Sequence, residues 1–317
     1  MKKIYPNIAK VNNKNLAVAI KYLKKNQAIG VPTETVYGLA GNAYSNSAVK
    51  KIYLLKKRPK INPLIVHYHN LNQIKNDVLI NQKFLKLYKK LCPGPITFVL
   101  KKKKNSKISK LVTANLNTVA IRFPKHRIIR RILKKISFPL AIPSANKSGG
   151  ISPVQAIDVA EEFNQKLKFI FDGGKSNIGI ESTVVDLTSV PKILRPGIIS
   201  GKEINTVIKS KVTNFDNLKT IRSPGLMKKH YSPGIPMKLN QKKIIKNHAF
   251  ITFGKKYPQS KNVFNLSKKS NLKDAARNLY SILRKIKKMN FRRIYVIKIP
   301  NKGIGVAIND RLKRAAN

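Results

Sequence analysis

The 317-residue chain is long enough for one large domain or two ordinary ones, and its 42% hydrophobic content excludes a disordered basic tail. Its 66 lysines and arginines outnumber its 12 acidic residues and give a formal net charge of +54. The excess is spread along the chain, which favours compositional bias with solvated faces over a dedicated nucleic-acid surface. The same positive field would also attract an anionic small molecule such as a nucleotide.

The single cysteine, Cys92, excludes an intramolecular disulfide and a metal site built from several cysteines. The N-terminal residues lack the apolar core of a secretory signal, and no run approaches the roughly 20 apolar residues of a membrane span. We therefore expect a soluble cytoplasmic protein that makes no membrane contact.

Strand-like and helical patterns are mixed over the first two hundred residues. The predicted strands lie at 27–33, 62–69, 96–103, 117–124, 138–146, 168–174, 181–187 and 191–197. The predicted helices lie at 15–25, 45–58, 126–136 and 152–165. Because the two kinds of element do not alternate regularly, the pattern favours a mixed α/β (α+β) fold with an open mixed sheet over a barrel.

The pattern weakens from about residue 211, where nearly thirty residues carry several Pro-Gly-type turns. Loops of this length are usually functional or are linkers. A strand at 249–254, a helix over 271–289, a strand at 293–300 and a closing helix from 305 follow it. We therefore predict a catalytic domain at 1–210, a linker at 211–238 that closes over the active site, and a small α/β domain at 239–317.

Polar side chains gather at the ends of the predicted strands, where rigid scaffolds present binding groups. The set comprises Thr33, Glu34, Thr35, Tyr37, Lys56, Arg58, Asn62, His67, Thr118, Arg122, Ser144, Asn146, Asp172, Glu181, Ser182, Thr183 and Arg195. The chain has no HExxH motif, no Cys/His pair and no Walker-type loop, so thiol or zinc proteolysis and a P-loop site are poorly supported. A site rich in Arg, Lys, Ser and Thr suits an anionic ligand.

Several of these residues also have plain structural interpretations. Thr33 can cap a simple turn, Glu34 can pair with a nearby lysine, and His67 can be a satisfied half-buried histidine. Arg122 follows apolar residues in a predicted strand, so we expect it to be partly buried and to need an anionic partner. Acidic residues are scarce in the chain, which makes a ligand anion an attractive partner. Tyr231 lies on a loop long enough to fold over a pocket.

Taken together and in this order, the motifs resemble those of L-threonylcarbamoyl-AMP synthases, the YrdC-like enzymes of tRNA threonylcarbamoyladenosine synthesis. The motifs are PTETVYGL (32–39), K-x-R (56–58), NPLIVH (62–67), CPGPITFVL (92–100), VAIRFPKH (119–126), PSANKSGGISP (143–153), DGG (172–174), GIESTVVD (179–186), ILRPG (193–197) and HYSPG (230–234). The resemblance covers about 15–235, and the extra C-terminal unit is similar to that of the two-domain members.

The resemblance implies a reaction of ATP, L-threonine and bicarbonate that releases pyrophosphate. It also implies a YrdC-like twisted open sheet with a concave basic face and a small Rossmann-like second domain. Magnesium is expected on the ATP phosphates, with no metal ligand assigned to the protein. A threonylcarbamoyl transferase is expected to act downstream. The alternatives are an RNA-binding protein that uses its positive charge non-specifically and, ranked last, a carbamoyl-transfer module.

The resemblance also assigns roles to individual residues. The expected L-threonine pocket consists of Thr35, His67, Arg122, Ile142 and Ser182, with Arg122 as the carboxylate fork. The expected ATP site consists of Arg58, Asn62, Thr118, Ser144, Ser152, Arg195 and Tyr231. The expected catalytic group consists of Lys56, Arg58, Ser144 and Asn146, in which Lys56 and Asn146 face phosphates.

Overall fold

The computed structural model of the chain describes residues 5–214, 230–243 and 247–317. Residues 215–229, which make up most of the predicted linker 211–238, lie outside this part of the chain, and the two boundaries of this linker stay a prediction. Among the described residues, no helix is both long and apolar enough to cross a membrane.

Two sheets are built from the described strands. The first has eleven strands in the order β1-β8-β2-β3-β7-β4-β6-β5-β9-β10-β11, and the second has four in the order β12-β15-β13-β14. The strands of the first are β1 (Ile8–Ala9), β2 (Ile29–Val31), β3 (Gly38–Asn42), β4 (Ile65–His67), β5 (Ile96–Lys101), β6 (Thr118–Arg122), β7 (Leu140–Ala141), β8 (Ile170–Phe171), β9 (Thr183–Asp186), β10 (Lys192–Arg195) and β11 (Thr213–Asn214). Those of the second are β12 (Met237–Lys238), β13 (Ala249–Thr252), β14 (Val263–Asn265) and β15 (Ile294–Val296).

The two sheets differ in strand direction. In the first, parallel and antiparallel pairs are mixed, so that β4 runs parallel to β6 and antiparallel to β7. In the second, every described pair is parallel. The prediction of a mixed α/β fold with a smaller α/β unit is therefore confirmed.

Eight α-helices are assigned within the described residues. They are α1 (Asn13–Lys24), α2 (Asn46–Lys56), α3 (Gln82–Leu91), α4 (Arg127–Lys134), α5 (Ala156–Phe163), α6 (Gly201–Ile208), α7 (Leu272–Lys288) and α8 (Ile304–Ala316). Helix α4 is an example of an amphipathic helix that forms because one face can be buried. Its apolar face is buried and its basic residues lie on the opposite face. The buried residues are Ile128, Ile129, Ile132 and Leu133. Helices α3 and α6 were not predicted.

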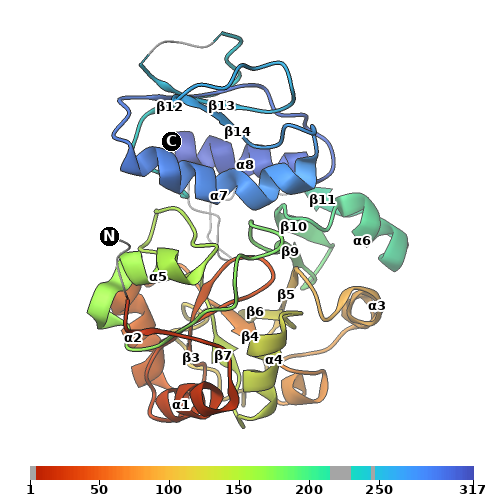
Figure 1. Cartoon of the computed structure of the whole chain (residues 1–317). Helices are drawn as coiled ribbons and strands as arrows, with labels where there is room; N and C mark the ends of the chain where they lie inside the picture. The colour runs from red at the N-terminus through yellow and green to blue at the C-terminus, as the bar shows by residue number, and fades with distance from the viewer. Residues whose placement is uncertain (1–4, 215–229, 244–246) are drawn as a thin grey trace.

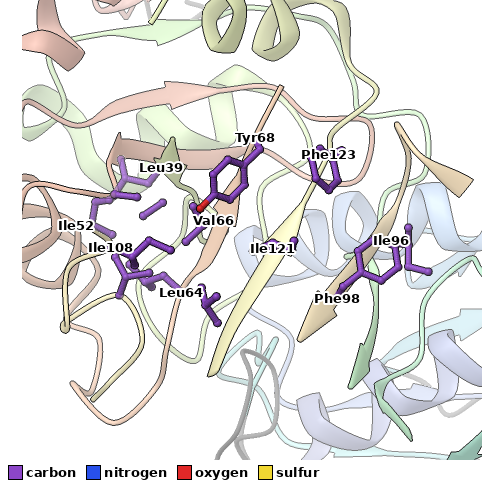
Figure 2. Packing of buried hydrophobic residues seen from close by; sticks show 14 of the residues in the cluster. Leu39, Ile52, Leu64, Val66, Tyr68, Ile96, Phe98, Ile108, Ile121 and Phe123 are labelled. Carbon is purple, nitrogen blue, oxygen red and sulfur yellow. The ribbon is translucent and has the colours of Figure 1, made fainter. Parts of the chain in front are cut away.

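The main hydrophobic core packs against one face of the first sheet, and Figure 2 shows part of this core. Val66, Ile121 and Phe98 project into this core from the neighbouring strands β4, β6 and β5. Close packing of this core holds the central strands in place. It therefore also keeps the residues at the ends of these strands at fixed distances from one another.

Helices α7 and α8 lie between the second sheet and the first domain (Figure 1). Their buried residues, such as Leu279 and Ile308, share one apolar cluster with Val36, Val154 and Ile180 of the first domain. The junction between the two domains is therefore packed as a core, and polar groups within it are shielded from water.

Candidate active site

The turn that joins β2 to β3 forms one wall of the site. The Thr33 hydroxyl donates to the Val36 carbonyl at 2.6 Å and accepts from the Thr35 amide at 3.2 Å. The Thr35 hydroxyl lies 2.8 Å from that of Thr33 and accepts from Arg122 Nη1 at 2.9 Å. This segment is thus both a tight turn and a wall of a buried site.

Arg122 and Glu34 form a buried ion pair, which changes the expectation for the arginine. Arg122 Nη2 lies 2.6 Å from Glu34 Oε1, and both side chains are almost fully buried. Burial alone would raise the pKa of Glu34, but the charge and hydrogen bond of Arg122 hold it below its ordinary value. Glu34 therefore neutralises the charge of Arg122. The scarcity of acidic residues in the sequence had instead suggested that an anionic ligand does so. Its Nε is buried without a hydrogen-bond partner and stays a donor.

His67 and Arg122 lie side by side because they are register partners at the ends of β4 and β6. His67 is buried, and its Nδ1 lies 3.2 Å from the Ile65 carbonyl. Burial and the charge of Arg122 hold the pKa of His67 well below its ordinary value, so the ring is neutral at neutral pH. Ile142, which is also buried, supplies an apolar surface beside these groups.

Ser182 and Arg195 meet where β9 begins and β10 ends. Arg195 donates from Nε to the Ser182 carbonyl and from Nη2 to its hydroxyl, both at 3.1 Å. Gly197 follows on the same turn, and a Cβ there would lie 2.3 Å from the Thr183 amide nitrogen. The arginine can approach the serine this closely because residue 197 has no side chain.

Arg58 follows α2 and is held by the loop that leads into β4. Its Nε donates to the Asn62 carbonyl at 2.9 Å, and its Nη2 donates to Asn62 Oδ1 at 2.6 Å and to the Pro63 carbonyl at 2.8 Å. Burial lowers the pKa of Arg58 to about 10, which leaves it charged at neutral pH. Asn62 therefore acts on the guanidinium by fixing its direction.

Lys56 braces the loop after β7. Its ammonium donates to the carbonyls of Ser144 and Asn146, and the side chain is 1% exposed. The Ser144 hydroxyl donates to Asn146 Oδ1 at 2.6 Å, and the Asn146 amide holds the Gly150 carbonyl at 2.9 Å. The structure thus aims Lys56 at protein carbonyls, in contrast to the expectation that it faces phosphates.

His230 and Tyr231 cover the pocket from the end of the predicted linker. Tyr231 is fully buried, stacks on Tyr280 with ring centroids 5.7 Å apart, and meets His230 edge to face. The Ser232 amide anchors the segment by donating to the Gly149 carbonyl at 2.9 Å. The Tyr231 hydroxyl is buried without a hydrogen-bond partner, as expected of a group that waits for a ligand or water.

These groups enclose a narrow pocket of about 50 Å³. It is lined by Thr35, Val36, Arg58, Ile65, His67, Arg122, Ile142, Pro143, Ser144, Glu181, Arg195, His230 and Tyr231. Five further predicted residues lie behind the lining and are hydrogen-bonded to it: Lys56, Asn62, Asn146, Ser152 and Ser182. Arg58 and Arg195 face this buried space without an ion pair to any described carboxylate, and two such guanidinium groups suit a ligand with several negative charges.

Thr118 is the one predicted site residue that the structure places elsewhere. It starts β6, whereas Arg122 ends the same strand. Thr118 lines a separate surface pocket beside Lys101–Lys104. The strand therefore separates the two residues that the sequence had assigned to neighbouring ligands.

Two family models together match most of the chain. Residues 21–197 match the Sua5/YciO/YrdC model, which is described as telomere recombination, and residues 199–317 match the model of the threonylcarbamoyl-AMP synthase C-terminal domain. The chain belongs to the Sua5/YrdC family, in its two-domain form. The threonylcarbamoyl-AMP synthases of Pyrococcus abyssi (strain GE5 / Orsay) and Bacillus subtilis (strain 168) are each 35% identical to it. These alignments cover 95% and 96% of this chain, and 94% of each relative.

The fold of this Sua5/YrdC member agrees with a solved relative over both domains. The crystal structure of P. abyssi Sua5 complexed with L-threonine matches with a TM-score of 0.90 at 32% identity. The match covers 98% of this chain and 97% of the relative. The arrangement of the two domains in this chain is therefore that of a known Sua5 protein.

Glu181 is a pocket residue that the sequence placed among the strand-end polar groups but to which it gave no role in binding or catalysis. It lines the pocket and accepts the Ser152 hydroxyl at 2.6 Å. Its place beside Ser182 in the GIESTVVD motif was a usable signal. Tyr280 and Arg311 of the second domain hydrogen-bond to Glu181. No sequence motif marks these two residues, because they lie in ordinary amphipathic helices.

The carboxylates of this Sua5/YrdC site do not form a metal centre. No group of three or more His, Cys, Asp or Glu side chains within the described ranges could hold a metal ion. Glu34 is paired with Arg122, and Glu181 with Arg311. Because both carboxylates are already neutralised, the residues present do not fit a protein-bound magnesium ion.

Proposed function

We propose that this protein is a threonylcarbamoyl-AMP synthase that uses L-threonine, bicarbonate and ATP and releases pyrophosphate. The observation that carries the proposal is the single buried pocket in which Thr35, His67 and Arg122 face Arg58 and Arg195. Family membership and the printed names of its relatives support the same activity. The product is expected to serve tRNA threonylcarbamoyladenosine synthesis through a downstream threonylcarbamoyl transferase.

The reaction balances without a protein nucleophile. The threonine nitrogen forms a bond to the bicarbonate carbon with loss of water and becomes a carbamate. A carbamate oxygen then attacks the α-phosphorus of ATP, and the bond to the β-phosphate oxygen breaks to release pyrophosphate. The residues of the pocket therefore serve positioning and charge neutralisation, which suit phosphoryl-centre chemistry.

Each side of the pocket has a proposed task. Thr35 and the free Nε of Arg122 would hold the threonine, with the neutral His67 and the apolar Ile142 around it and Ser182 supporting the site from behind the lining. Arg58, Arg195 and the Tyr231 hydroxyl would hold ATP, and Ser144 lies between the two groups. Lys56, Asn62, Asn146 and Ser152 would position these groups from behind. Magnesium would be held by the ATP phosphates, and no step is assigned to it.

A pyrophosphate-release assay tests the proposal. We expect release only when ATP, L-threonine and bicarbonate are all present, because the attacking oxygen exists only on the carbamate. Release that does not need threonine would overturn the proposed activity. Non-specific RNA binding stays a separate prediction, and a steep loss of RNA affinity with added salt would identify it.

A further inference from the structure

A cluster of buried polar side chains joins the second domain to the rear of the pocket. Arg311 of α8 donates from Nε to Glu181 Oε2 at 3.0 Å, and the Tyr280 hydroxyl of α7 donates to the same oxygen at 2.9 Å. The other oxygen of Glu181 accepts the Ser152 hydroxyl at 2.6 Å. One carboxylate thus connects two helices of the second domain with a predicted ATP-binding serine.

Arg311 also supports the aromatic cover of the pocket. Its guanidinium carbon lies 5.3 Å from the centroid of the Tyr231 ring, and Tyr280 stacks on the same ring from the second domain. An arginine over an aromatic face is attractive and directional. The guanidinium therefore contacts both elements that shape this end of the pocket, Glu181 and Tyr231.

The surroundings indicate that this cluster is not the main contact between the two domains. Val36, Val154, Ile180 and Leu279 already form a continuous apolar cluster across the junction. Burying an ion pair usually contributes no more stability than apolar side chains of the same size. Arg311 is 1% exposed, and Asp310 also pairs with it at 2.7 Å, so its geometry is set on several sides. Its Nε and Nη1 are held by Glu181 and Asp310, and its Nη2 is buried without a hydrogen-bond partner. A guanidinium held at two nitrogens is suited to orienting other groups.

We propose that Arg311 is a positioning residue for ATP: it orients Glu181, and through it Ser152, and it backs the ring of Tyr231. The inference rests on the proposed function because it takes Tyr231 as an ATP-binding residue and Ser152 as a residue that supports the ATP site from behind. The second domain then takes part in nucleotide binding without touching the nucleotide. The threonine side of the pocket is held separately, by Glu34 and Arg122.

A second arginine at the same junction provides a matched control. Arg284 of α7 donates to the Ile151 carbonyl at 2.6 Å and to Glu162 Oε1 at 3.1 Å. It therefore bridges the same two domains, but its described contacts include neither Glu181 nor Tyr231. Arg284→Met removes an interdomain arginine and keeps the contacts among Arg311, Tyr280 and Glu181, while it releases the Ile151 carbonyl next to Ser152.

The test measures equilibrium binding of a non-hydrolysable ATP analogue and of L-threonine to full-length Arg311→Met, Arg311→Lys, Tyr280→Phe and Arg284→Met. Because hydrogen bonds to charged groups are involved, we expect Arg311→Met to weaken the analogue by about 10-fold or more. Threonine affinity is expected to stay within about 2-fold, since its contacts are held by another pair. Arg311→Lys keeps the charge and should recover part of the lost affinity for the analogue. The affinity of Tyr280→Phe for the analogue should lie between those of the wild type and Arg311→Met.

Three results separate the possible outcomes. If Arg311→Met weakens both ligands equally, or if Arg284→Met weakens the analogue as much, Arg311 serves the interface alone and the proposal is overturned. If Arg311 acts through Glu181, Arg311→Met combined with Glu181→Gln should bind the analogue no more weakly than the worse single variant; additive losses would contradict that route. Failure of the wild-type protein to release pyrophosphate would overturn the proposed function instead, since the binding assay needs no turnover.

Discussion

At the scale of single residues, Glu34 links the stability of the pocket to its specificity. Arg122→Ala leaves the Glu34 carboxylate buried and unpaired, which we expect to cost about 3–5 kcal/mol of unfolding free energy. It should also weaken L-threonine far more than ATP, because Arg122 belongs to the proposed threonine side. Urea denaturation and calorimetric titration of each ligand provide the two measurements.

The double variant Glu34→Gln with Arg122→Met separates these two effects. It removes both charges together, so it should recover most of the stability lost in Arg122→Ala while threonine binding stays weak. Recovery of threonine binding along with stability would show that Arg122 acts only by folding the site.

The protonation state of His67 gives a second prediction at this scale. Its pKa is held well below the ordinary value by burial and by Arg122, so the ring should stay neutral from pH 7 to about pH 6, past the ordinary histidine value near 6.5. L-Threonine keeps its own charges over that range. Its affinity, measured by calorimetry without ATP, should therefore change by less than about 2-fold between these limits. A loss of affinity that follows one ionisation near pH 6.5 would contradict a neutral, buried His67.

At the scale of elements, the end of α2 and the loop after β7 behave as one unit because Lys56 joins them. Lys56→Met leaves the carbonyls of Ser144 and Asn146 without this donor, and each unmet buried carbonyl costs about 1–3 kcal/mol. We expect lower stability and a higher KM for ATP with little change for threonine. Lys57→Met is the matched control, since Lys57 is exposed on the next residue. Equal effects of the two variants would exclude a bracing role for Lys56.

Most elements with a clear hydrophobic pattern were predicted from the sequence, including α1, α2, α4, α5 and the central strands β4, β5 and β6. Strand β3 was missed because Gly38–Asn42 has low strand propensity and pairs with β2 and β7 through tertiary contacts. A Cβ at Gly38 would lie 2.2 Å from Ile142 Cγ2, so this glycine is required by packing. Helix α6 could have been found, because Ser200 and Glu203 form a capping box at its start.

The sequence predicted the site residues that lie in its motifs, but not the residues that hold them from elsewhere in the chain. The strand-end residues were brought together because neighbouring strand ends share an edge, as with His67 and Arg122. The sequence pattern could not predict which charged residues form ion pairs, because the partners lie far apart in the chain. Glu34 pairs with Arg122 across 88 residues, and Glu181 pairs with Arg311 across 130. Thr118 was assigned to the ATP site by the resemblance, although the predicted strand at 117–124 already placed it at the opposite end from Arg122.

At the scale of the whole molecule, the contact between the domains should depend on pH through Glu181. Burial alone would raise the pKa of this carboxyl, but Arg311, Arg195 and the Ser152 hydroxyl lower it to about 2 from an ordinary value of 4.5. A lowered pKa in the folded state contributes stability above pH 4.5, and this contribution is lost as the pH falls towards 2. A shift of this size corresponds to about 3 kcal/mol at neutral pH.

Glu181→Gln should therefore be less stable than the wild type at pH 7, and the difference should shrink as the pH falls from about 4.5 towards 2. The other lowered carboxyl, Glu34, is present in both proteins, so its own acid dependence cancels in the comparison. Urea denaturation of both proteins across this range measures the difference directly. A gap that stays constant with pH would mean that the Glu181 carboxylate does not hold the two domains through its charge.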